Sequence, residues 1–262
     1  MILPKPLNKL RNKSNVRIIF TDIDDTITTD GKLPANSYQA LWQLHNRGYI
    51  IIPITGRPAG WCEMIARFWP VHGVIGENGG FYFRLHKNKM QREFFYSEAT
   101  RKKNQKKLEK VKKEILKKYP KAQIASDQFS RLLDLAVDIC EDVKPHLKKK
   151  EVKDIVSIFE KHGAIAKVSS IHINGWFGKY DKLTMCKKYV KNELKLNFDK
   201  NLETFLFSGD SPNDEPMFQA FPNSVGVANI KEFIMDLKHP PKFITEKEGA
   251  DGFVEITKVL LA

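Results

Sequence analysis

The sequence predicts an α/β fold: a doubly wound, Rossmann-like parallel sheet core interrupted by an inserted α+β cap domain. Short apolar runs alternate with amphipathic segments over residues 16–83, and the same texture returns over residues 179–262. Residues 84–178 differ, because their strand patterns alternate more and their helices carry most of the lysines. We therefore expect a core made of 16–83 and 179–262, a cap over 84–178, and a flexible N-terminal arm over residues 1–15.

The first half of the core should begin with the buried strand VRIIFTD, which is apolar until its last residues. NSYQALWQLHNRG predicts a helix with Asn36 as its N-cap and Gly48 just past its end. The second strand is YIIIPIT, and PAGWCEMIARFW is typical of a helix opened by Pro58. GVIGENGGFYF predicts a third strand broken by a glycine-rich turn. This β-α-β-α-β run implies right-handed crossovers.

The remaining elements follow in order. In the cap we expect two strands within AQIASDQFSRLLDLAVDI, a helix over KPHLKKKEVKDIVSIFEKHG and strand structure in AIAKVSSIHINGWFG. The core should resume with the helix KLTMCKKYVKNEL, the strand TFLFSGD, a short helix in NDEPMFQAF and the strand SVGVAN. It should end with the helix IKEFIMDL, the strand KFIT and the helix GFVEITKVLL.

Composition indicates an ordinary globular chain of 262 residues, 42% hydrophobic and 29% charged. No apolar run approaches the ~18 residues of a membrane span, and the first 15 residues lack the apolar segment of a secretory signal. The three cysteines, Cys62, Cys140 and Cys186, have no metal-ligand spacing, and their odd number argues against a disulfide framework. We expect a cytoplasmic protein, either a monomer or a small homo-oligomer.

The formal charge of +13 is concentrated in residues 101–120, which hold ten Lys or Arg against two Glu. Within this segment Leu108, Val111, Ile115 and Tyr119 recur at helical spacing, which predicts an amphipathic helix with a solvated basic face. That face has no aromatic side chains for base stacking, so nucleic acid is not a favoured partner. Attraction of an anionic partner or substrate is the alternative.

Polar clusters lie at the predicted carboxyl ends of strands, where ligands of open α/β sheets bind. The strand ends carry DIDDT (22–26), TGR (55–57) and GDSPND (209–214), and Lys182 opens the helix that returns to the core. These strand ends would bring together four carboxylates, those of Asp22, Asp24, Asp210 and Asp214. The four would repel one another unless cations intervene. Oxygen ligands suit Mg²⁺, especially where a phosphate completes its shell.

In order, DIDDT, ITGRP, Lys182 and GDSPND resemble the four motifs of the haloacid dehalogenase superfamily of phosphotransferases. GENGG and ITEKEGADGF also resemble its sugar-phosphatase branch with a large α+β cap. That branch includes Cof-type, sucrose-phosphate and trehalose-6-phosphate phosphatases and the phosphomannomutases. One such motif is weak alone, whereas four in order, each ending a predicted strand or opening a helix, form a specific pattern.

The resemblance implies a role for each motif. Asp22 would be the nucleophile that forms an aspartyl-phosphate, and Asp24 would protonate the leaving oxygen and later activate water. The phosphoryl group would be bound by Thr55, Gly56 and Lys182. The Mg²⁺ ion would be held by Asp22, the backbone carbonyl of Asp24, Asp210 and Asp214.

Two departures from the family pattern stand out. Asp25 occupies a position where the family most often has glycine, and we assign it no role. GKYDKL offers both Lys179 and Lys182, and we favour Lys182 because DKLTM resembles the start of the family's helix. Further substrate contacts are predicted at Arg57, Asn78, Asn213, His172, Asn174 and Trp176. The alternatives are a structural ion pair for Arg57, shaping of the turn for Asn78, helix capping for Asn213, and packing for the three cap residues. A sugar ring would stack well on Trp176.

The function predicted is a Mg²⁺-dependent phosphomonoesterase acting on a small phosphorylated metabolite, such as a sugar phosphate. A phosphomutase is the first alternative, but it needs extra arginines that face the site from the cap. The arginines of that region do not cluster in the sequence; they are Arg84, Arg92, Arg101 and Arg131. The second alternative is a binding protein that uses the basic cap for nucleic acid or another polyanion.

Overall fold

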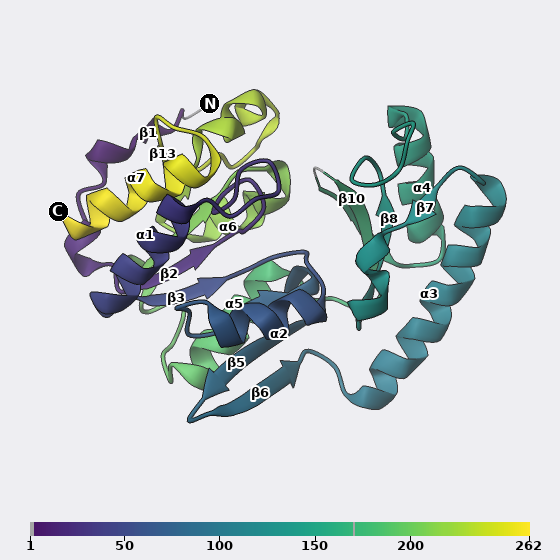
Figure 1. Cartoon of the computed structure of the whole chain (residues 1–262), viewed down its shortest axis with the longest axis horizontal. Helices are drawn as coiled ribbons and strands as arrows, with labels where there is room; N and C mark the ends of the chain where they lie inside the picture. The colour runs from purple at the N-terminus through teal and green to yellow at the C-terminus, as the bar shows by residue number, and fades with distance from the viewer. Residues whose placement is uncertain (1–2, 170) are drawn as a thin grey trace.

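The computed structural model describes residues 3–169 and 171–262, and it shows a larger core joined to a smaller cap (Figure 1). Within that described part, the core is built on six parallel strands in the order β1-β13-β12-β11-β2-β3. Their bounds in this order are Lys5–Pro6, Phe243–Ile244, Asn223–Gly226, Phe205–Gly209, Ile18–Thr21 and Ile50–Pro53. The parallel core and the antiparallel cap described below confirm the predicted fold class.

Helices cover both faces of this sheet. Successive residues of a strand point to opposite faces, so neighbouring side chains pack against different helices. Ile18 and Phe20 of β2 pack in the cluster that includes α5 (Lys182–Glu193) and α6 (Glu215–Ala220). Ile19, between them, packs on the other side with α1 (Ala35–Asn46) and α7 (Gly249–Leu261). Apolar strands are therefore buried on both faces, as the doubly wound pattern predicts.

The predicted third strand belongs to a separate antiparallel sheet of β4 (Val74–Gly76), β5 (Phe81–His86) and β6 (Lys89–Phe94). It meets the main sheet through one parallel bridge between Ile54 and Ile75, and α2 (Ala59–Phe68) packs against it. Tyr82 of β5 donates a 2.6 Å hydrogen bond to Glu193 of α5. A core–cap boundary after residue 83 therefore divides a hairpin that packs with the core, and the division of domains stays a proposal.

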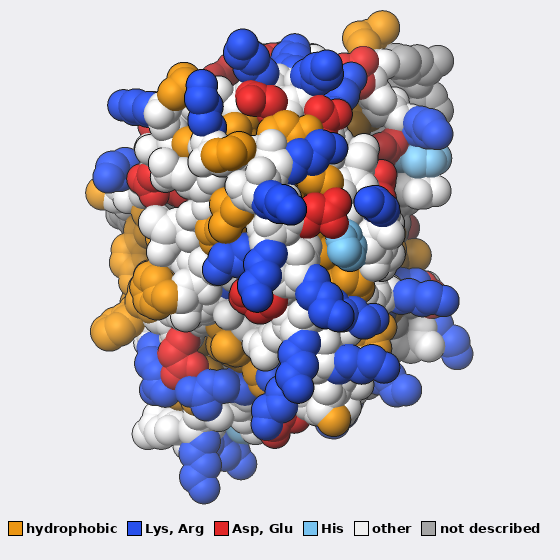
Figure 2. Space-filling view, turned by 90° about the vertical axis from the view of Figure 1, so that its right-hand side faces the viewer, with side chains coloured by type: hydrophobic (Ala, Val, Ile, Leu, Met, Phe, Trp, Pro, Cys, Tyr) orange, Lys and Arg blue, Asp and Glu red, His pale blue; other side chains and the backbone are white. Residues whose placement is uncertain are grey.

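The cap contains a four-stranded antiparallel sheet in the order β7-β8-β10-β9, with bounds Gln123–Ile124, Asp134–Asp138, His172–Trp176 and Ile165–Val168. α3 (Glu98–Lys118) and α4 (Lys149–Lys161) pack on one face of it. Leu108, Val111 and Ile115 form the buried stripe of α3, as predicted. Figure 2 views the molecule from the cap end and shows Lys and Arg side chains spread over that face.

Two connections join core and cap, and they lie side by side. Tyr96, between β6 and α3, accepts a 3.0 Å hydrogen bond from the amide of Lys179, between β10 and α5. A Cβ atom on Gly178 would approach the Tyr96 ring to 2.4 Å. The rings of Phe95, Tyr96 and Tyr180 also contact one another, so the chain leaves and re-enters the core at one aromatic cluster.

Three local expectations are corrected. Residues 3–15 are not a flexible arm, because β1 pairs with β13 and Leu7 and Leu10 are buried in the core. Asn36 lies inside α1, whose N-cap is Pro34. IKEFIMDL forms two 3₁₀ turns, Ala228–Glu232 and Ile234–Asp236, instead of one helix. Among the described residues, no helix has the length and apolar character needed to cross a membrane.

Candidate active site

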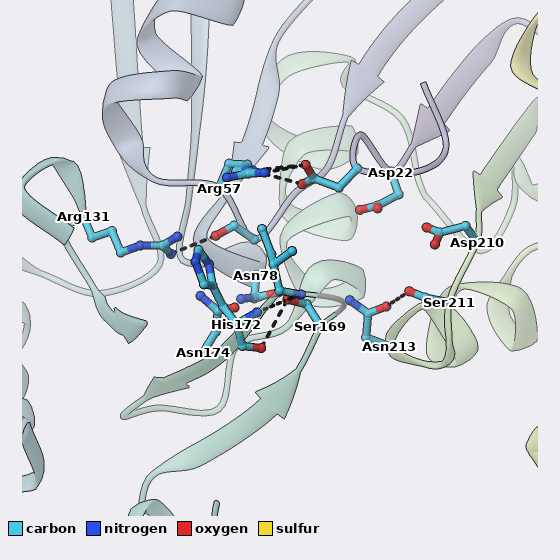
Figure 3. Close-up of a pocket in the computed structure, with 13 residues that line it drawn as sticks. Asp22, Arg57, Asn78, Arg131, Ser169, His172, Asn174, Asp210, Ser211 and Asn213 are labelled. Atoms are coloured by element: carbon cyan, nitrogen blue, oxygen red, sulfur yellow. Dashed lines mark hydrogen bonds and ion pairs between the residues drawn. The ribbon is translucent and has the colours of Figure 1, made fainter. Parts of the chain in front are cut away.

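The predicted motifs meet at one edge of the core sheet. Thr21 of β2 pairs in register with Ser208 of β11 on one side and with Pro53 of β3 on the other. Since the three strands are parallel, their carboxyl ends lie at the same edge. Asp22 therefore follows β2 next to the end of β11, and its amide donates a 2.8 Å hydrogen bond to Ser208. Figure 3 shows the side chains of Asp22 and Asp210 near one another at this edge.

Lys182 completes this cluster from the start of α5. Its Nζ atom lies 2.7 Å from Oδ1 of Asp22 and 2.7 Å from Oδ1 of Asp214, and all three side chains are buried. Asp181 caps the helix by accepting a 2.7 Å hydrogen bond from the Thr184 amide. The structure thus places Lys182 at the carboxylates, whereas Lys179 is exposed and lies outside the cluster.

A glycine in the GENGG turn positions this helix start. Gly79 has a φ of +101°, and a Cβ atom there would lie 2.1 Å from the Asp181 carbonyl oxygen. Only glycine permits both this backbone conformation and this approach. The turn and the Lys182 helix can therefore pack directly against each other.

The acidic cluster is suited to a divalent cation. Carboxylate oxygens of Asp22, Asp210 and Asp214 all lie within 4.8 Å of one another, and Lys182 compensates only part of their charge. Burial raises the pKa of Asp22 to about 8, although the nearby Lys182 acts in the opposite direction. The pKa of Asp210 is also raised, by burial and by the neighbouring charge of Asp22. An all-oxygen, negatively charged set fits Mg²⁺, whose charge would favour the ionised carboxylates.

Asp24 is not part of this cluster and is bound by Arg57 instead. Its Oδ1 atom accepts hydrogen bonds from Arg57 Nε at 3.1 Å and Arg57 Nη2 at 3.0 Å. Arg57 also donates from Nη1 to Glu141 of the cap at 3.1 Å, and the other Glu141 oxygen lies 2.9 Å from His172 Nε2. Burial and the nearby Arg131 lower the pKa of His172. One chain of polar contacts thus connects Asp24 to the cap.

A small cavity of about 40 Å³ separates the strand ends from the cap. Asp22 and Asp210 line its core side (Figure 3), together with Asp24. The polar cap residues on its other side are Arg131, Ser169, His172 and Asn174. His172 and Asn174 alternate along β10, so they share the face of the cap sheet that is turned away from α3 and α4.

The other predicted contacts differ in their positions. Gly56, Asn78 and Asn213 line the same cavity, and the Gly56 carbonyl accepts a 3.0 Å hydrogen bond from Arg131. Thr55 is buried and not among the lining residues; its hydroxyl accepts a 2.9 Å hydrogen bond from the Arg57 amide. Their predicted roles in phosphate and substrate binding remain proposals.

Trp176 does not reach this cavity. Its side chain is buried, donates from Nε1 to the Tyr180 carbonyl at 3.3 Å, and stacks on the Tyr180 ring. It lines a second, neighbouring cavity instead. Trp176 alternates with Asn174 along β10 and shares its face of the sheet, but the strand carries Trp176 past the acidic cluster.

Sequence reasoning missed Glu77, which fastens the cap to the core. Its buried carboxylate accepts hydrogen bonds from the Ala59 amide of the core and from three cap amides, those of Leu132, Leu133 and Asp134, at 2.6–3.2 Å. Burial and Asp134 raise the pKa of Glu77 to about 8, against the lowering effect of the amide donors. The acidic residue in a glycine-rich turn was the available signal, but its partners in the cap lie more than fifty residues away.

Sequence reasoning also missed Arg131, Ser169 and Glu141. Arg131 was considered only as one of several unclustered arginines, and its side chain is buried between Asp127 and Asp134. Its contact with Gly56 joins positions 75 residues apart. No local pattern in the sequence marks such a contact.

Comparisons with known proteins agree with this geometry. The fold places an acidic cluster at the strand ends of an α/β core, beside a cap. Residues 19–115 match the model of the haloacid dehalogenase-like hydrolases, the family that the motifs resemble, and this match supports a phosphatase. A phosphoglycolate phosphatase from Methanobrevibacter smithii is 25% identical over 250 residues, which cover 92% of this chain and 97% of that protein.

Solved structures share the fold at lower identity. The structure of Thermoplasma acidophilum 0175 has a TM-score of 0.71 and 20% identity, covering 94% of this chain and 98% of that one. The C-terminal domain of C. albicans trehalose-6-phosphate phosphatase also has a TM-score of 0.71, with 16% identity, covering 99% of this chain and 98% of that domain. Each of these two matches covers both the core and the cap of this chain.

Proposed function

We propose that this phosphatase is a Mg²⁺-dependent phosphomonoesterase that hydrolyses a small phosphorylated metabolite of the sugar phosphate class. The contact of Lys182 with both Asp22 and Asp214, beside Asp210, carries the proposal. It brings a nucleophile, a cation for the phosphoryl oxygens and oxygen ligands for a metal into one buried cluster. The phosphatase activity named for the M. smithii relative supports hydrolysis of a small phosphorylated metabolite.

The reaction would proceed in two displacements at phosphorus. In the first, an Asp22 oxygen attacks phosphorus, the bond to the leaving oxygen breaks, and Asp24 gives that oxygen a proton. In the second, water attacks the aspartyl-phosphate and gives a proton to Asp24, and the Asp22–phosphorus bond breaks to release inorganic phosphate. Lys182 would stabilise the phosphoryl oxygens in both steps. Mg²⁺ would add charge neutralisation and orientation of the phosphoryl group.

The phosphomutase alternative is not favoured by the arginines of the cap region. Arg84 pairs with Glu193, and Arg92 pairs with Glu63. Arg101 lies over the Phe94 ring. Arg131 alone of the four lines the cavity, and its guanidinium is already bound to two carboxylates and a carbonyl. Arg84, Arg92 and Arg101 do not line the cavity, so none of the four presents a free guanidinium to a second phosphate there.

Removal of divalent metal should abolish turnover, because the carboxylates at Asp22, Asp210 and Asp214 would then repel the substrate phosphate. We expect phosphate release from a panel of sugar phosphates, phosphoglycolate and nucleotides in Mg²⁺, a fall to background with EDTA, and recovery when Mg²⁺ is restored. Circular dichroism of the EDTA-treated protein controls for unfolding. Release that persists unchanged under chelation would contradict the metal-dependent mechanism.

A further inference from the structure

A second cavity, of about 360 Å³, adjoins the one at Asp22. It lies between cap strands β9 and β10 and the start of α5, with Trp176 on the cap side and Leu183 on the core side. Asn78 and Asn213 line both cavities. Lys182 lines the second cavity and contacts Asp22, which lines the first. The two spaces therefore meet at the site where the phosphoryl group would bind.

The volumes of the two cavities indicate which of them can hold the organic part of a substrate. The 40 Å³ beside Asp22 has room for a few water molecules, whereas pockets for small organic ligands usually measure about 300–1,000 Å³. The second cavity reaches that range. Of these two cavities, the second is the one with space for a leaving group larger than a few atoms.

The cap sheet supplies a cation at the junction. Lys167 of β9 pairs in register with Asn174 of β10, and Ile165 pairs with Trp176. Directly opposed residues in an antiparallel pair share one face of the sheet, with Cβ atoms about 4.5–5.5 Å apart. Lys167 is therefore the neighbour of Asn174, which lines the first cavity, and itself lines the second.

The second cavity carries positive charge that the protein does not compensate. In the described ranges, neither Lys167 nor Lys179 has a side-chain hydrogen bond or ion pair, and both are exposed. The carboxylate of Asp181, which also lines the cavity, caps α5. Lys182 is already bound to Asp22 and Asp214.

Two buried polar atoms of lining residues also lack a partner within residues 3–169 and 171–262. They are Asn78 Nδ2 and the Tyr180 hydroxyl oxygen. Burying such a group without a hydrogen bond costs about 1–3 kcal/mol, so these atoms indicate where a polar ligand or water binds. The cavity thus combines free cations with unsatisfied polar groups and the aromatic wall of Trp176 and Tyr180.

We propose that the leaving group of the substrate occupies this second cavity and carries a second anionic group, a carboxylate or a phosphate, bound by Lys167 and Lys179. The inference rests on the proposed function and refines it. The preferred substrate is a phosphorylated sugar acid or a sugar bisphosphate, and a neutral sugar phosphate is a poorer one.

The test compares kcat/KM for 6-phosphogluconate, fructose 1,6-bisphosphate and glucose 6-phosphate. We expect kcat/KM for at least one of the two acidic compounds to exceed kcat/KM for glucose 6-phosphate about tenfold or more. Lys167→Gln and Lys179→Gln should each lower this ratio of kcat/KM values about tenfold, mainly by raising KM for the acidic compound. Lys110→Gln, on the exposed face of α3, is the matched control and should leave the ratio unchanged. Preference for 6-phosphogluconate alone identifies a carboxylate, and preference for the bisphosphate alone identifies a phosphate.

Equal kcat/KM for neutral and acidic compounds, or a ratio insensitive to both substitutions, would overturn the inference while leaving the phosphatase intact. Absence of phosphate release from all three compounds and from the wider panel would count against the proposed function instead. Calorimetric binding to Asp22→Asn then tests the cavity independently of turnover. Tighter binding of an acidic compound that is lost with Lys167→Gln supports the inference, and equal affinities refute it.

Discussion

Replacement of Asp22 by Asn should lower turnover by about 10⁴-fold or more, because an amide oxygen cannot form the phosphoenzyme. The fold should survive. Asn has the same shape, its oxygen can still accept from Lys182, and Lys182 keeps its contact with Asp214. Phosphate release measures the first effect and thermal unfolding the second.

Asp25→Asn is the matched control for this substitution. Asp25 stands in the same acidic run and has a φ of +55°, a conformation that Asn tolerates well. Its carboxylate has no assigned role, so turnover should stay within a few-fold of the wild type. A well-folded Asp22→Asn protein that retains substantial activity would remove Asp22 as the nucleophile.

Glu77→Gln should destabilise the protein by about 3 kcal/mol, because it leaves buried backbone donors unpaired. In the wild type, Oε2 of Glu77 accepts from the amides of Leu132, Leu133 and Asp134. The NH₂ group of Gln cannot accept, and turning the side chain only moves the mismatch to Ala59, which donates to Oε1. Urea unfolding monitored by tryptophan fluorescence measures the loss.

The same substitution should change the pH dependence of stability. The pKa of Glu77 in the folded protein is about 8, above its ordinary value of 4.5. Its contribution to stability is therefore fully present below about pH 4.5 and is lost as pH rises through 8. The difference in unfolding free energy between wild type and Glu77→Gln should be larger at pH 5 than at pH 8.5.

Glu109→Gln controls for the loss of an acidic residue, because Glu109 is exposed on α3. It should alter stability by no more than about 0.5 kcal/mol, as is usual for surface substitutions. Equal stabilities of Glu77→Gln and Glu109→Gln at both pH values would show that the amide contacts of Glu77 do not hold the cap to the core.

The parts of the fold that the sequence predicted are those encoded locally. Apolar runs such as the one ending at Thr21 identify strands buried on both faces, and the polar residues that follow them mark the carboxyl edge of the sheet. The choice of Lys182 over Lys179 agrees with the positions of both side chains in the structure. Its basis was the similarity of DKLTM to a family motif, because spacing alone did not separate the two lysines.

The parts that were wrong or missed depend on distant contacts. Leu7 and Leu10 stand isolated in a basic segment, and only pairing of β1 with β13 shows that they are core residues. Asn229 donates to the Asp25 carbonyl and accepts from the Gly249 amide, which holds its segment in 3₁₀ turns despite a helical pattern. Arg131 contacts Gly56, 75 positions away in the sequence, and no periodic pattern predicts such a contact.

The meeting of the two connections at Tyr96 has a consequence for how such enzymes diversify. Because the chain leaves and re-enters the core at neighbouring points, the region between them behaves as a cassette whose exchange need not shift the register of β2, β3 or β11. Asp22, Lys182 and the acidic cluster are contributed by the core, whereas Lys167 and Asn174 belong to the cap. Replacing the cassette would change what the enzyme recognises and keep how it breaks the phosphate ester.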